Sequence, residues 1–101
     1  MTDSGGTFDG SRYAEYAQTA TTQAAVLRGA AARIDQATGS VSRAVSSASF
    51  SAPSAARFRQ RTGDALTDLR ADSRRLTTLA DTLDRMSQHY QDLYLAWKAA
   101  H

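Results

Sequence analysis

Apolar residues recur at alternating spacings of three and four along the first half of the chain. All positions of this pattern except Thr38 are apolar or aromatic. One series comprises Tyr13, Ala20, Leu27, Ile34, Val41 and Ala48, and the interleaved series comprises Ala17, Ala24, Ala31, Thr38 and Val45. A spacing of this kind that is held over about five heptads predicts one long helix that packs against another helix.

The same pattern returns in the second half. One series there comprises Ala55, Thr62, Leu69, Leu76, Leu83, Tyr90 and Trp97, and its partner series comprises Phe58, Ala65, Asp72, Leu79, Met86, Leu93 and Ala100. Between the two halves the chain is rich in serine and contains its only proline, Pro53. Because proline suits the first turn of a helix but not its interior, we predict helices over about 11–48 and 54–98, joined by a turn over about 49–53.

The predicted fold is all-α, an antiparallel two-helix hairpin, because so short a connection makes neighbouring helices run in opposite directions. Residues 1–10 are polar and glycine-rich and are expected to form a flexible tail, with Asp9 or Ser11 capping the first helix. The turn implies that Tyr13 faces Tyr90. Asp72 is a polar residue on the predicted seam, so either it fixes the pairing register or the helix is rotated to expose it.

Several apolar residues flank the predicted seam, and a two-helix hairpin has no enclosed core in which to bury them. Small chains with thin cores commonly gain stability by association, and the usual product of two hairpins is a four-helix bundle. Trp97 extends beyond the start of the first helix, where it is either covered by Phe8 or offered to a partner, unless it simply lies on a frayed C-terminal turn. The residues expected to bind a partner are Tyr16, Val26, Leu66, Tyr90, Leu93, Tyr94, Leu95 and Trp97.

The composition gives little support to other kinds of function. The 101 residues include no cysteine, and 12 basic against 10 acidic residues leave a net charge of +2. No polybasic block, membrane-spanning run or secretory signal peptide is visible. His89 with Asp92 gives too few ligands for a metal, and the ladder Asp64, Asp68 and Asp72 is expected to balance nearby arginines. We therefore expect no enzyme activity and no catalytic, metal or cofactor site.

The segment Phe50-Ser51-Ala52-Pro53-Ser54-Ala55-Ala56-Arg57-Phe58 resembles the turn of the WXG family, the small helical hairpins of type VII secretion. Phe50 and Ala52 stand where that family has Trp and Gly, and Pro53 and Phe58 follow its pattern. The family's C-terminal export signal is a Tyr followed four residues later by Asp or Glu. This signal is absent, because the residue four positions after Tyr90 is Tyr94 and the residue four positions after Tyr94 is Lys98. This departure favours a member that works with another chain over a self-exported homodimer.

The resemblance implies a type VII secretion-associated protein that acts by association between hairpins, as a secreted substrate or as the secretion partner of a larger effector. Its partner would be a second copy, a related hairpin or the helical N-terminal region of an effector, together with the secretion machinery. It would be cytoplasmic before export and then secreted without a cleavable signal peptide, binding neither nucleic acid nor membrane. The alternative is a cytoplasmic coiled-coil scaffold or a nucleic-acid-associated hairpin with no export role.

Overall fold

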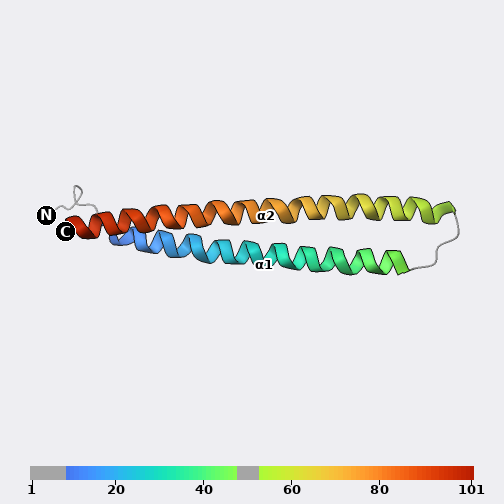
Figure 1. The fold of residues 1–101 in the computed structure, drawn as a ribbon, viewed down its shortest axis with the longest axis horizontal. Coiled ribbons are helices and arrows are strands. Elements are labelled where there is room, and N and C mark those ends of the chain that lie inside the picture. The colour runs from blue at the N-terminus through green and yellow to red at the C-terminus, as the bar shows by residue number, and fades with distance from the viewer. Residues whose placement is uncertain (1–8, 48–52) are drawn as a thin grey trace. The chain divides into compact units, whose positions relative to one another are not determined.

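A computed structural model describes residues 9–47 and 53–101 and contains two helices, α1 (Ser11–Ser47) and α2 (Pro53–Ala100) (Figure 1). The first has 37 residues and the second has 48. The described residues contain no strand. The prediction of an all-α antiparallel hairpin is confirmed, and the predicted helix bounds lie close to the observed ones. The pairing into a four-helix bundle stays a prediction because it involves a second chain.

Asp9 is the residue that caps α1. Its Oδ1 atom accepts hydrogen bonds from the Ser11 hydroxyl at 2.6 Å and from the Ser11 backbone N–H at 3.0 Å. The Ser11 hydroxyl bond, then the backbone bond, lowers the pKa of Asp9 below its ordinary value, and nearby Arg12 adds to the effect. The choice between Asp9 and Ser11 as the cap is thereby settled, and Asp9, which we assigned to the tail, takes part in the helix start.

Pro53 opens α2, the first-turn position that the sequence indicated. The rest of the predicted turn, including Phe50 and Ala52, lies outside the described residues, as do Ala48 and residues 1–8 of the predicted tail.

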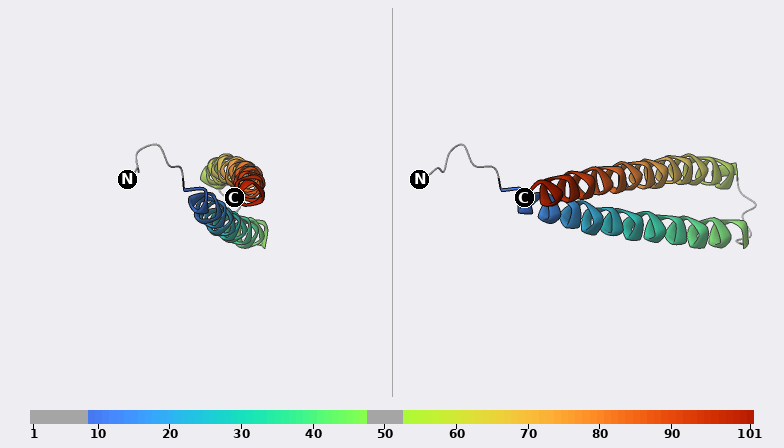
Figure 2. Two further views of the ribbon diagram at one scale, coloured as in Figure 1. Left: turned by 90° about the vertical axis from the view of Figure 1, so that its left-hand side faces the viewer. Right: turned by 60° about the vertical axis from the view of Figure 1, so that its left-hand side comes forward.

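The chain divides into two compact units, each containing part of both helices. The terminal unit consists of Met1–Ala25 with Ala80–His101, and the central unit is Val26–Leu79. Both views in Figure 2 show the start of α1 and the end of α2 side by side in the terminal unit. The two units are described separately below.

The buried face of α1 follows the predicted seam in both units. Ala17, Ala20 and Ala24 are buried in the terminal unit, and Ala31 and Thr38 are buried in the central unit. Thr38 tolerates this position because its hydroxyl donates a hydrogen bond to the Asp35 carbonyl at 2.9 Å. Val41 is the exception, since it was expected in the seam and is exposed.

The buried face of α2 differs from the prediction by a rotation of about one residue. The first predicted series is partly right, because Ala55 is buried, but Leu69 is exposed. The partner series is wrong: Phe58, Ala65, Asp72, Leu79 and Met86 are exposed. The buried positions lie one residue later, at Leu66, Ser73, Ala80 and Ser87.

Small side chains explain this rotation. Facing small residues let two helix backbones approach closely, which gains dispersion contacts along the whole seam. The buried serines find partners across it: the Ser73 hydroxyl donates to the Ala31 carbonyl at 3.2 Å, and the Ser87 and Thr21 hydroxyls lie 2.8 Å apart. Among the described residues no large side chain is fully buried, so the seam is thin and much of the apolar surface lies beside it.

Candidate protein-binding surface

An apolar groove runs between the two helices of the terminal unit. It has a volume of about 440 Å³, and none of its lining side chains is charged. The lining consists of Tyr16, Thr19, Ala20, Gln23, Leu83, Met86 and Tyr90. Tyr16 and Met86 are both exposed although they are large and mostly apolar. A groove with this lining suits an apolar helix face better than a small polar ligand.

The position of the groove follows from the small-residue seam beside it. Leu83, Met86 and Tyr90 recur at spacings of three and four on α2, next to the buried Ala80 and Ser87. Because the small residues occupy the contact between the helices, the large ones lie along its edge. The heptad pattern had predicted that Leu83, Met86 and Tyr90 lie inside the seam itself.

Two tyrosines that line the groove, Tyr16 and Tyr90, pack together with a third, Tyr13. The rings of Tyr13 and Tyr90 are stacked with centroids 6.0 Å apart, as the predicted register required. Tyr16 meets Tyr90 edge to face at 5.4 Å. Aromatic pairs in these geometries contribute about 0.5–1.5 kcal/mol beyond their buried area, so Tyr90 is held in position from two sides.

Trp97 packs against the residue that precedes α1. Gly10 is buried directly on the indole ring, and any side chain at this position would overlap with the ring. The Tyr94 and His101 rings lie 6.1 Å and 5.1 Å from Trp97. Its indole Nε1 is buried and has no hydrogen-bond partner among the described residues. Trp97 is therefore a half-buried packing residue of the terminal unit.

The other predicted partner-binding residues fall into three groups. Val26 and Leu95 are strongly exposed, at 55% and 61%. Leu93 and Tyr94 are half-buried. The prediction that Leu66 flanks the seam is wrong, because this side chain is only 7% exposed and belongs to the hairpin's own contact.

The central unit exposes more large apolar side chains than the sequence analysis anticipated. Val41, Leu69 and Leu79 were assigned to the seam, and all are exposed. The recurrence of small residues at Ser73, Ala80 and Ser87 is the signal that could have revealed the rotation. The exposed set of the central unit is Val26, Val41, Phe58, Leu69 and Leu79.

Asp72 and Asp92, which the sequence singled out as possible functional residues, contact neighbouring side chains within α2. Asp72 forms an exposed ion pair with Arg75 at 2.6 Å, which settles the choice between a seam role and an exposed position in favour of exposure. The Asp92 carboxylate accepts a hydrogen bond from Gln88 at 3.0 Å. In residues 9–47 and 53–101, no group of three or more acidic or histidine side chains is placed to hold a metal ion.

Comparison with known proteins adds no family to these observations: no family model, curated protein or solved structure matches the chain. Neither described helix is long and apolar enough to cross a membrane. The function is therefore argued from the groove, from the exposed apolar residues and from the resemblance at the turn.

Proposed function

We propose that this chain is a WXG-like protein of type VII secretion that acts by associating with a second helical hairpin. It serves as a secreted substrate or as the secretion partner of a larger effector. The observation that carries the association is the thin seam of small residues, which leaves large apolar side chains exposed in both units. The link to secretion rests on the turn segment, where Pro53 opens α2.

The exposed side chains are sufficient in number to drive association. Complete burial of one large apolar side chain contributes about 1.5–3 kcal/mol, and those in question are already partly covered. Even at half of this value, several of them together reach several kcal/mol. A small domain is stable by only about 5–15 kcal/mol in total, so association would contribute on the scale of the whole fold.

The partner is another helical hairpin or the helical N-terminal region of an effector. The groove of the terminal unit has the lining expected of a helix-binding site, because its apolar residues recur at helical spacing and carry no charge. The missing export signal after Tyr90 and Tyr94 favours a partner that supplies one.

Co-expression tests the choice of partner. The chain is produced with each hairpin or effector N-terminal region encoded by neighbouring genes, and the complexes are isolated through a tag on the partner. We expect one such partner to co-purify in a fixed ratio and to raise the thermal stability of the chain. Recovery of the chain alone as a stable monomer in every case would contradict the proposal.

Secretion is tested separately. The chain should appear in the culture supernatant of its host, and its export should stop when the type VII secretion ATPase is deleted. A cytoplasmic protein monitored in the same samples controls for lysis. Retention in the cells, together with a gel shift of DNA or RNA at physiological salt, would favour the cytoplasmic alternative instead.

A further inference from the structure

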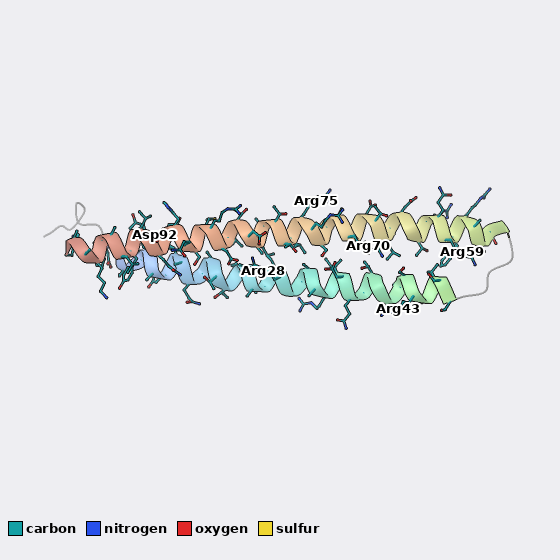
Figure 3. All side chains as sticks on the ribbon, in the orientation of Figure 1. Arg28, Arg43, Arg59, Arg70, Arg75 and Asp92 are labelled. Atoms are coloured by element: carbon teal, nitrogen blue, oxygen red, sulfur yellow. The ribbon has the colours of Figure 1, made fainter. Side chains whose placement is uncertain are left out.

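The central unit contains a second groove whose chemistry is polar. It has a volume of about 560 Å³, and its walls include Asp35, Thr38 and Gly39 from α1 and Arg70, Arg74 and Thr77 from α2. Arg70 and Arg74 are one helical turn apart, so both guanidinium groups belong to the same wall. In Figure 3 Arg70 lies on the side of α2 that faces α1, whereas Arg75 projects away from it.

The two arginines of this groove have no ion-pair partner in the described part of the chain. Asp35 on the opposite wall forms no ion pair there either. Arg75, by contrast, is paired with Asp72. The groove thus combines two positive charges with one negative charge, a net charge of +1.

Three of the hydroxyl groups in the groove, those of Thr38, Ser73 and Thr77, already donate to the backbone. Thr38 donates to the Asp35 carbonyl at 2.9 Å, and Thr77 donates to the Ser73 carbonyl at 3.1 Å. The guanidinium groups of Arg70 and Arg74 are the charged donors that line the groove. Arginine presents its N–H groups in a planar fork that matches a carboxylate.

Gly39 is not required by the hairpin itself. No glycine among the described residues has a positive φ, and an added Cβ at Gly39 would meet only Arg43 Nη1, at an ordinary 3.7 Å. Glycine inside a helix costs about 1 kcal/mol relative to alanine. The missing side chain keeps the α1 wall of the groove low and leaves room for an entering group.

We propose that this groove binds a single Asp or Glu carboxylate from an acidic segment of a protein partner, between Arg70 and Arg74. One carboxylate balances the net charge of the groove. A doubly charged phosphate would exceed it and would add to the repulsion from Asp35. The proposal goes beyond the association described above and does not depend on export.

The test is an NMR titration of the full chain at low salt, where exposed charges are weakly screened. The probe is a short helical peptide with one glutamate, and its control is the same peptide with glutamine in its place. We expect shifts of amides in 35–39 and 70–78 with the glutamate peptide only. Equal shifts with the glutamine peptide, or no shifts with either, would overturn the proposal.

Neighbouring arginines provide matched variants. We expect Arg74→Gln to weaken peptide binding roughly threefold to fivefold, the range for an exposed charge pair. Arg75→Gln removes the same charge one residue away and should leave binding unchanged, while Asp35→Asn should tighten it. Equal losses of peptide binding in Arg74→Gln and Arg75→Gln would contradict the site. Parallel titrations compare acetate with inorganic phosphate, and larger amide shifts with phosphate than with acetate would also contradict it.

These measurements use the isolated chain and a peptide. Their failure would therefore leave the association between hairpins untouched, and a failed association test would leave the titration result standing. Circular dichroism of each variant, with helix content equal to that of the parent chain, ensures that a loss of binding reflects the groove.

Discussion

The two units are built on the same kind of seam but have grooves of opposite character. The terminal unit has an uncharged groove with Tyr16 and Met86 at its edge. The central unit has a groove that contains Arg70, Arg74 and Asp35. Small buried residues hold α1 and α2 together in both, so the difference comes from the residues beside the seam.

Because of this difference, one groove would contribute mainly to the affinity for a partner and the other mainly to the selectivity. Burial of apolar surface is non-directional and supplies most of the free energy of association. Charged groups contribute less net affinity but exclude unsuitable partners and fix orientation. In our proposals the terminal groove supplies binding free energy, and the polar groove of the central unit selects an acidic partner.

Charge introduced into the apolar groove should have the largest effect. Met86→Asp places a carboxylate in the surface to be buried, so we expect association to weaken by at least roughly tenfold. Ala25→Asp is the matched control, because Ala25 is exposed in the same unit, does not line the groove and is not among the predicted partner-binding residues. Sedimentation equilibrium measures both, and an equal loss for the two variants would remove the groove from the interface.

Enlarging the seam tests the rotation of α2. Ala80 is fully buried, so Ala80→Leu overpacks the contact and should destabilise the chain by about 1–3 kcal/mol. Ala65 lies on the series that the sequence analysis placed in the seam, and it is exposed. Ala65→Leu should therefore change stability little in chemical unfolding. A larger loss of stability for Ala65→Leu than for Ala80→Leu would mean that Ala65 lies in the seam, as the periodicity predicted.

Two glycine substitutions should have opposite signs. Gly10→Ala forces a methyl group into the Trp97 ring and should destabilise the terminal unit by about 1 kcal/mol or more. Gly29 has open space around the position of a Cβ, so Gly29→Ala should stabilise α1 by up to about 1 kcal/mol. Thermal unfolding compares them, and stabilisation by both would mean that Gly10 does not pack on Trp97.

The smallest effect is the titration of Asp9. Its pKa is lowered mainly by the Ser11 hydroxyl, so the cap stabilises the folded chain above the ordinary value of 3.8 and loses this effect as pH falls through the lowered pKa. Thermal unfolding should therefore show a small loss of stability as the pH falls below 3.8 and through the lowered pKa. Asp9→Asn keeps a capping side chain that does not titrate, so this variant should not show that loss of stability. The same pH profile for the variant and the parent chain would exclude a contribution from Asp9.

Periodicity predicted the helices, their bounds and the Tyr13–Tyr90 pair, because these depend on local spacing and a short turn. It missed the rotation of α2 because it favoured large residues for the seam, whereas close approach favours Ser73, Ala80 and Ser87. The burial of the two serines depends on hydrogen bonds to the other helix, which a one-dimensional pattern does not contain. The contact of Gly10 with Trp97 likewise depends on how the ends of α1 and α2 meet.

The pairing of Arg75 explains why the polar groove could not be found by counting charges. Arg70, Arg74 and Arg75 look equivalent in the sequence, yet Arg75 pairs with Asp72 and the other two line the groove. Arg75 reaches Asp72 within α2 itself, whereas the rotation of α2 decides that Arg70 and Arg74 line the groove.

The association itself is tested most directly by sedimentation equilibrium of the purified chain, alone and with its co-purifying partner, over a range of micromolar concentrations. We predict a mass corresponding to two hairpins for at least one of these samples, with helix content that rises as the complex forms. A monomer of 10.9 kDa that stays fully helical alone, and that gains neither mass nor stability from any partner, would contradict the central claim.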